Sequence, residues 1–429
     1  MLKHIQLRYP PEKLLLIFLP LLFFVTPLSS SAKSILIGVV VAIIIASPRY
    51  RQDLATLFSN HWCRSALFLF FLALVGCLWS PASLGEKGLV LEKWSKLLYL
   101  PILIVGFQDT KIRNRALHAF LFAMLLTCVL SFFIQYTHYF HIKNSAADSV
   151  FRNHIMTGMM MSFATYVALL FSIQARGTKR IGYLVLSLIF SYQILFVNQG
   201  RTGYVLFLLL MAALIIQQFN KRQAAIGLLA LITLFSSCYY LSSPLQHGIH
   251  RVIYNLQSYE QNKNTPIGYR LQFHAFAKNL FKSHPLIGGG TGSFTYSFRT
   301  ENPVPAWTNN TSHSGRLLEP HSQYWLVAAE FGVVGLLGLL WFYLELLVIA
   351  YRLDAMRPIA MALLLIFALG NTSDSLLFYS GSGYFFILFF ALALSEKANS
   401  IITATRVSMG KLNELKAKNI QEKTTLVGG

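Results

Sequence analysis

Apolar stretches separated by short polar segments run through almost the whole chain. About twelve of them come near the 20 or so residues that a helix needs to cross a bilayer, with shorter ones at proline or polar breaks. Their centres lie near Phe23, Val41, Leu72, Leu100, Met124, Phe163, Leu188, Leu209, Ile232, Leu339, Leu365 and Leu388. We therefore predict an all-α integral membrane protein with about twelve transmembrane helices.

The composition agrees with a membrane protein. The 429 residues are 55% hydrophobic and only 12% charged, with a mean hydropathy of +0.53, whereas a soluble domain carries about 25% charged residues. The net charge of +20 comes from short clusters of bases between apolar runs, which is an orientation signal rather than a nucleic-acid-binding stripe. We expect membrane lipids and no nucleic acid as partners. The four cysteines have no CxxC spacing, so neither a disulfide framework nor a zinc site is expected.

The first apolar run, Leu14 to Leu28, follows several bases and resembles a cleavable signal peptide. Lys33 leads directly into the next run, Ile35 to Ala46. We therefore interpret the first run as the uncleaved first helix of a hairpin.

Basic clusters in the short loops set the orientation. If the N-terminus is inside, every cluster of two or more bases falls on the inner side except Lys93 and Lys96, at the start of the fourth span. The inner clusters are Arg49, Arg51 and Arg64; Lys111, Arg113 and Arg115; Arg176, Lys179 and Arg180; Lys221 and Arg222; and Arg352 and Arg357. We predict that both termini are cytoplasmic.

One connection is much longer than the others. The segment from Ser242 to Pro320 joins the ninth and tenth spans on the outer face, and it holds seven Lys or Arg residues against three acids. A long loop is usually functional, and a basic one beside a membrane suits an anionic headgroup or a lipid-linked phosphate. The predicted plan is spans one to nine in residues 1–241, a mostly helical outer segment carrying the site in 242–330, spans ten to twelve in 331–396, and a basic cytoplasmic tail in 397–429.

Two arginines on the outer face are candidate anion-binding groups. Arg201 follows a tight turn and opens the eighth span, with glycines on both flanks that permit close ligand approach; the alternative is an arginine that snorkels at the helix end. Thr265 and Pro266 predict the start of a helix that runs to about Ser283. Arg270 lies near its first turn, where a bound anion would offset the unfavourable helix dipole; the alternative is a plain surface arginine.

That helix is expected to place an apolar face on the bilayer or against the spans, formed by Leu271, Ala275, Phe276 and Leu280. The glycine-rich stretch 284–292 follows it. This stretch lacks the Lys-Ser/Thr of a P-loop and the strand–helix context of a dinucleotide fold. We interpret it as a tight turn that ends the helix.

His321 is the candidate general base. It lies in a polar approach to the tenth span, just after Glu319 and Pro320, and histidine can accept a proton near neutral pH. The nearby helix N-terminus favours the neutral ring, whereas the Glu319 carboxylate favours the protonated ring. The alternative is an interfacial polar residue. The predicted topology puts His321 on the same face as the two arginines, and we expect all three to line one outward-facing cavity.

At these residues the chain resembles the O-antigen ligase family. His321-Ser322, then nine residues, then Gly332-Val333-Val334-Gly335 fits that family's pattern of His, Asn/Ser/Gln, nine residues and Gly-x-x-Gly. The Thr pair that often follows is Leu336-Leu337 here. The Gly-Arg turn at Arg201 and the Arg270 helix leading into the 284–288 stretch are also similar. The resemblance covers the twelve-span plan and is specific from about 200 to 335.

The resemblance implies a glycosyl transfer on the periplasmic face of the bacterial inner membrane. The donor would be a polysaccharide on undecaprenyl pyrophosphate, and the acceptor a sugar hydroxyl of lipid A–core. His321 would be the catalytic base, Arg201 and Arg270 would bind the pyrophosphate, and Gly332 and Gly335 would form a structural motif. The reaction would invert the anomeric centre and would need no metal or cofactor.

Three alternatives share parts of this pattern. An O-antigen polymerase uses the same donor, but the Arg, ten residues, Gly spacing of some polymerases is absent, since position 212 is Ala and position 281 is Phe. A protein O-oligosaccharide ligase belongs to the same superfamily. A polysaccharide flippase or transporter would show repeats and mid-membrane ionisable groups, whereas these candidates lie at the outer surface.

Overall fold

The computed structural model describes residues 10–58, 60–137, 146–309 and 317–398, which are helical with no strand among them. The elements are α1 (Pro11–Leu28), α2 (Ser30–Ala46), α3 (Pro48–Leu57), α4 (His61–Val75), η1 (Gly76–Leu78), α5 (Leu84–Ser95), η2 (Lys96–Leu98), α6 (Tyr99–Gly106), α7 (Thr110–Thr137), α8 (His154–Gln174), α9 (Gly177–Tyr192), the π-helix η3 (Gln193–Val197), α10 (Arg201–Gln218), α11 (Lys221–Leu241), α12 (Ser243–Gln257), α13 (Pro266–Ser283), α14 (Ser293–Glu301), α15 (Pro305–Thr308), α16 (Gln323–Tyr351) and α17 (Arg357–Ser373). A last helix covers residues 380–398.

Eight of the described helices are long and apolar enough to cross a membrane, or nine if the bent pair α2–α3 is one span. α17 is apolar but shorter. Each of the twelve predicted centres lies in a helix. The chain is therefore a multi-pass helical membrane protein, and twelve crossings remain a prediction. Residues 1–9 and 399–429, which hold the ends of the chain and most of the predicted basic tail, lie outside the described residues.

The predicted second span stops at Ser47, where α2 and α3 meet at 96°. Ser47 has an extended backbone (φ −84°, ψ 120°), and Pro48 is the first residue of α3. A residue before proline is driven away from the helical region, and proline suits the first turn of a new helix. The bend therefore follows from Pro48, and it leaves α2 with 17 residues.

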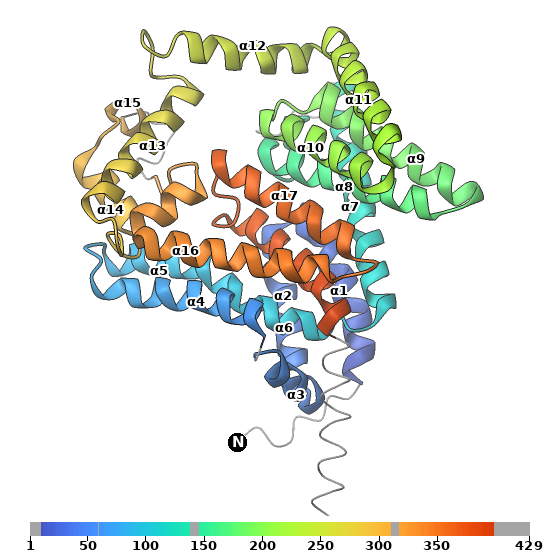
Figure 1. Cartoon of the computed structure of the whole chain (residues 1–429), viewed down its shortest axis with the longest axis horizontal. Coiled ribbons are helices and arrows are strands. Elements are labelled where there is room, and N and C mark those ends of the chain that lie inside the picture. The colour runs from blue at the N-terminus through green and yellow to red at the C-terminus, as the bar shows by residue number, and fades with distance from the viewer. Residues whose placement is uncertain (1–9, 59, 138–145, 310–316, 399–429) are drawn as a thin grey trace, which may run out of the picture.

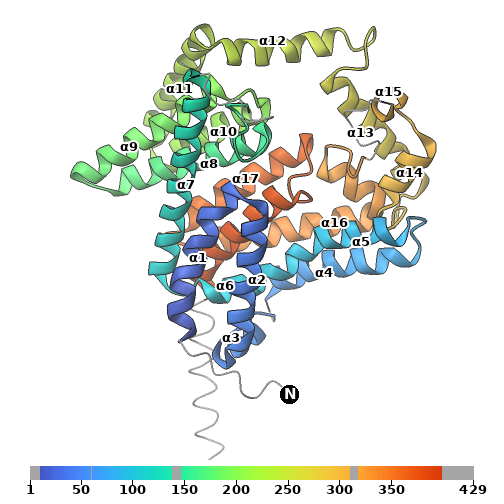
Figure 2. The same ribbon diagram turned by 180° about the vertical axis from the view of Figure 1, so that it is seen from behind.

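The helices form groups that meet around α16 and α17 (Figure 1). α1 packs on α2 and α7, as expected for an N-terminal hairpin, and these three lie at the front in Figure 2. α8 packs on α9 and α10, while α16 packs on α4, α13 and α17. α10 reaches α17. α12 bridges the top of the molecule from α11 to the α13–α15 group (Figure 1), so the outer segment passes above α10 and α17.

The predicted helix after Thr265 is confirmed as α13. Thr265 caps it, because its side chain accepts a hydrogen bond from the Gly268 amide. The predicted apolar face is only partly right. Phe276 is buried, but Leu271 and Ala275 are exposed, and the buried face is instead formed by Gly268, Phe273, Phe276 and Ala277. The face is rotated because α13 packs on α16 and on aromatic residues of α14.

α16 is broken at Gly332, whose backbone (φ 61°, ψ −153°) is not helical. The glycine-rich stretch 284–292 fills the break. The amides of Val333 and Val334 donate to the carbonyls of Pro285 and Leu286, at 2.8 and 3.1 Å, while amides of the stretch donate to α16 carbonyls before the break. A Cβ at Gly332 would lie 2.6 Å from the Pro285 oxygen. The stretch does more than end α13, since it supplies hydrogen bonds that the interrupted helix lacks.

The two lysines that did not fit the charge rule have specific partners. Lys93 Nζ donates to Ser380 Oγ at 3.0 Å. Lys96 is buried, and its Nζ donates to three consecutive carbonyls at 2.7–3.0 Å, those of Leu377, Phe378 and Tyr379. Their position is therefore set by the turn between α17 and the last helix rather than by membrane orientation.

Candidate active site

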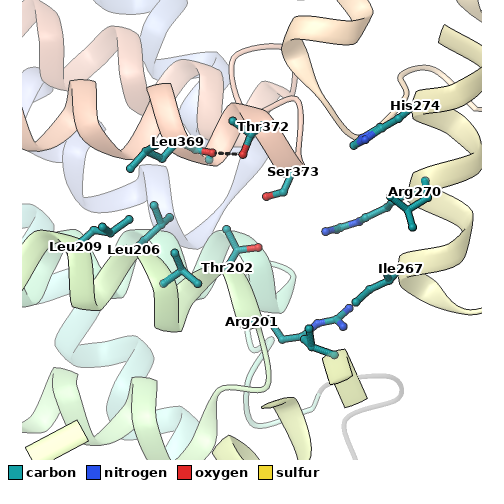
Figure 3. A pocket seen from close by; sticks show the side chains of 14 residues that line it. Arg201, Thr202, Leu206, Leu209, Ile267, Arg270, His274, Leu369, Thr372 and Ser373 are labelled. Carbon is teal, nitrogen blue, oxygen red and sulfur yellow. Dashed lines mark hydrogen bonds between the residues drawn. The ribbon is translucent and has the colours of Figure 1, made fainter. Parts of the chain in front are cut away.

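A cavity of about 450 Å³ opens between α10, α13 and α17. Arg201 reaches it from the start of α10, and Arg270 and His274 reach it from α13 (Figure 3). Thr372 and Ser373, at the end of α17, line the facing wall. Apolar side chains form most of the remaining wall, among them Val205, Leu206, Leu209, Val252, Ile267, Leu271 and Leu369. The cavity thus joins a cationic end to an apolar end.

A rigid turn positions Arg201. The buried Asn198 side chain accepts a hydrogen bond from the Gly200 amide at 2.6 Å and donates to the His154 carbonyl at 3.1 Å. A Cβ at Gly200 would lie 2.7 Å from that carbonyl oxygen, so only glycine allows the turn to pack this closely on α8. The turn is therefore specified by its own residues and delivers Arg201 at the first position of α10.

The Arg201 guanidinium has no partner among the described residues. Its Nη1 atom is buried and makes no hydrogen bond, and the nearby charges that act on it are the cations Arg270 and Arg251. A buried guanidinium nitrogen without a partner costs free energy. Two cations facing one cavity therefore indicate a site for an anion.

Arg270 connects the cavity to a buried carboxylate. Its Nη2 atom lies 3.4 Å from both carboxylate oxygens of Asp374, which caps the C-terminal end of α17. The Asp374 side chain is only 1% exposed, whereas that of Arg270 is 24% exposed. Because only Nη2 contacts Asp374, the other guanidinium nitrogens keep donors available for a ligand in the cavity.

His321 lies behind the cavity and not on its wall. Its Nδ1 atom is 3.1 Å from Asp374 Oδ1 and 3.3 Å from Glu319 Oε1, its ring stacks on Phe273, and its carbonyl accepts a hydrogen bond from His274 Nε2 at 3.1 Å. The expectation that His321 lines the cavity with both arginines is therefore wrong. His321 is connected to the cavity through its neighbours, because its carbonyl accepts from the cavity residue His274 and its ring shares Asp374 with Arg270.

The backbone at His321 is in the left-handed region, with φ 55°. A non-glycine residue pays roughly 1–3 kcal/mol for a sparsely populated conformation of this kind, and such residues cluster at functional sites. The Glu319 side chain holds the turn, because its Oε2 accepts from the His321 amide at 2.6 Å. This strain is consistent with a ring held in one orientation.

Glu319 is a hub of hydrogen bonds and is only 3% exposed. Ser375 Oγ donates to its Oε2 at 2.6 Å, and the Tyr379 hydroxyl donates to its Oε1. Sequence reasoning missed Asp374, Ser375 and Tyr379 as members of the site. Asp374 did leave a signal, because it is an acid in the short connection between the last two predicted spans.

The pKa of His321 is shifted in the direction opposite to the one expected from the nearby helix N-terminus. Burial lowers the pKa of His321, but the Glu319 charge and the Asp374 hydrogen bond raise it more, so the pKa lies above its ordinary value. The helix N-terminus is outweighed because two buried carboxylates face Nδ1 directly. Burial lowers the pKa of His274, which leaves this second ring neutral.

The arrangement can hold a proton acceptor in one tautomer. Nδ1 faces carboxylates, so it carries the ring proton and Nε2 keeps its lone pair. A carboxylate that orients a histidine in this way is a recurring feature of general-base catalysis.

These features define a multi-pass helical membrane protein with an arginine-lined cavity beside a histidine–carboxylate pair. The family model described as O-antigen ligase matches residues 184–340. The match confirms the resemblance to the O-antigen ligase family over this region, which is about a third of the chain. The matched region contains Arg201, Arg270 and His321, while Asp374 lies beyond it. No curated protein matches the chain.

The family sets the broad class of activity. Its members are glycosyltransferase-like enzymes of lipopolysaccharide and glycan biosynthesis. Their partners are in general lipid-linked polysaccharides and lipids.

Proposed function

We propose that the chain is an O-antigen ligase, which transfers O-antigen polysaccharide from undecaprenyl pyrophosphate to a sugar hydroxyl of lipid A–core. The observation that carries the proposal is the unpaired Arg201 guanidinium, which shares a cavity with Arg270. Arg270 in turn shares Asp374 with His321. An anion site and a base are thereby joined through one carboxylate.

The donor fits the two ends of the cavity. Planar guanidinium groups bind phosphate oxygens through two hydrogen bonds at once, so Arg201 and Arg270 would hold the pyrophosphate. The apolar side chains of α10 and α17 continue from the arginines. They would contact the first units of the prenyl chain where it enters the membrane.

The reaction is a direct displacement at the anomeric carbon. The acceptor hydroxyl oxygen forms a bond to that carbon while the bond to the pyrophosphate oxygen breaks, and the electron pair leaves with the pyrophosphate. The arginines neutralise the departing charge, so no acid is needed to protonate it. The displacement inverts the anomeric centre and requires no metal or cofactor.

His321 would take the proton of the acceptor hydroxyl. The Asp374 contact keeps the proton on Nδ1, so Nε2 is the accepting atom. The raised pKa makes the ring a stronger base, although a larger fraction is then protonated at neutral pH.

The site would face the periplasm of a bacterial inner membrane. In this plan the outer segment 242–330 lies between the spans of 1–241 and those of 331–396, and the tail 397–429 is cytoplasmic. The basic clusters of the short loops support this orientation.

The test is a reaction between purified protein, the lipid-linked donor and lipid A–core. We expect capped lipid A–core with the wild type and with Lys263→Ala, an exposed change, and at least about a hundredfold slower capping with His321→Ala. A product in which one lipid-linked chain extends another would identify a polymerase instead. Movement of donor across vesicles without a covalent product would identify a flippase, and either result would overturn the proposal.

A further inference from the structure

A second, polar cavity of about 420 Å³ lies away from the arginines. We call it the outer polar pocket. Its walls come from the end of α13, the glycine-rich stretch, α14, and the connection that follows η1. Trp79 contributes an aromatic ring, and Ser283, Ser293, Ser297 and Glu301 contribute oxygen atoms. Nothing in the proposed transfer step uses this pocket.

Ser293 gives the pocket an unpaired hydroxyl. The residue is 4% exposed, and its Oγ has no hydrogen-bond partner among the described residues. It lies against the pocket wall, where a Cβ at Gly289 would be 2.7 Å from the Ser293 oxygen. A buried polar atom in a native protein normally has a partner, so the missing partner points to a ligand group.

Glu301, the last residue of α14, adds an exposed carboxylate to the pocket lining. Trp79 donates its Nε1 proton to the Gly288 carbonyl at 3.2 Å, which fixes the ring in the wall. The pocket thus presents a fixed aromatic ring, hydroxyls, one carboxylate and the imidazole of His284.

This set of groups suits a neutral polyhydroxyl ligand. A carboxylate accepts hydrogen bonds from ligand hydroxyls but repels a phosphate, while the C–H face of a sugar ring can pack on an indole. Pockets of this kind obtain their specificity from a few convergent polar groups. The chemistry is therefore opposite to that of the arginine cavity.

We propose that the outer polar pocket binds sugar residues of a glycan substrate, and this rests on the proposed glycosyl transfer. α13 links the two sites, because His274 lines the arginine cavity and Ser283 lines the outer polar pocket. They are nine positions apart, which is about 13 Å along the helix axis and two and a half turns around it, so they lie on opposite faces of α13. A sugar chain that leaves the arginines and passes around the C-terminal end of α13 reaches the pocket, whether the chain belongs to the donor polysaccharide or to the acceptor core.

The test measures binding without turnover. Lipid-free O-polysaccharide fragments and lipid-free core oligosaccharide are titrated separately into the purified full-length protein and followed by saturation-transfer NMR or calorimetry. Ser293→Ala and Glu301→Gln should each weaken binding about three- to tenfold, the worth of one hydrogen bond. Thr300→Ala, an exposed hydroxyl loss on the same helix, should not change it. The melting temperature of Ser293→Ala should equal that of the wild type, because the lost hydroxyl has no partner.

Each outcome decides the proposal. The oligosaccharide whose affinity falls in both variants identifies the source as donor or acceptor. The proposal is overturned if neither oligosaccharide binds, if both bind equally well to the variants, or if inorganic pyrophosphate displaces the sugar. His321→Ala should keep wild-type oligosaccharide affinity, so loss of transfer and loss of glycan binding are separable. A wild-type protein that binds sugar through Ser293 without capping lipid A–core would contradict only the proposed function.

Discussion

Replacing Asp374 with asparagine isolates the charge that faces His321. Asp374 Oδ1 lies 3.1 Å from His321 Nδ1 and 3.4 Å from the Arg270 guanidinium. Asparagine keeps the shape of the side chain but removes its charge. It can also turn its amide nitrogen toward Nδ1, which would move the ring proton to Nε2 and occupy the atom that must act as base.

The expected changes have two parts. An opposite charge within about 4–6 Å shifts a pKa by roughly 1–3 units, and because Glu319 remains 3.3 Å away, we expect the lower end, about 1 unit or 1.4 kcal/mol. The direction of the pH dependence follows from the protonation state of His321 that is active. Neutral imidazole accepts the proton, so wild-type transfer rises with pH through a group whose pKa lies above its ordinary value. In Asp374→Asn this rise moves to lower pH, and the plateau falls roughly a hundredfold or more through loss of the base.

The assay is initial rate of lipid A–core capping from about pH 5 to 9, which brackets the histidine pKa. Asp354→Asn is the matched control, since Asp354 is an exposed acid in the connection between α16 and α17, and its profile should follow the wild type. If Asp374→Asn kept both the wild-type plateau and the wild-type midpoint, Asp374 would not orient or charge His321, and the assignment of the base would be wrong.

Three further substitutions test other parts of the site. His321→Ala should fold, insert and bind donor, but transfer at matched protein level should fall roughly a hundred- to ten-thousandfold; near-normal transfer would leave His321 an interfacial anchor. Arg270→Lys should bind the donor poorly because lysine lacks the planar fork, while Lys263→Ala should be mild; unchanged donor affinity in Arg270→Lys would reduce the arginine to a generic charge. Gly332→Ala should lower the free energy of unfolding by at least about 3 kcal/mol, because its backbone is nearly restricted to glycine and its Cβ would meet the Pro285 carbonyl. A wild-type melting temperature for that variant would argue against the break in α16.

Local signals in the sequence were sufficient for much of the helical plan. Thr265 and Pro266 predicted the start of α13 correctly, because a cap and a first-turn proline act within one helical turn. Apolar runs located helices at every predicted centre. The bend at Pro48 was not anticipated, although proline and its preceding residue carry that information locally.

The site itself depends on contacts that no local pattern encodes. Arg270 and Asp374 are 104 positions apart, and the glycine-rich stretch meets Gly332 only after the outer segment has folded back onto α16. The helix-terminus argument failed at His321 because it considered one neighbouring element. The Asp374 carboxylate, which helps to raise the pKa of His321, comes from the end of α17, 53 positions away.

The partners of Lys96 have a consequence for the order in which the protein assembles. The first carbonyl that accepts from its Nζ is 281 positions later in the chain, so at about 5–20 residues per second the ribosome makes it on the order of 15–55 s after Lys96. Throughout that interval an ammonium group destined for a dry interior has only water, lipid headgroups or the insertion machinery to solvate it. The α5–α6 segment is therefore expected to stay near the membrane surface during synthesis and to dock late, when the last helix arrives.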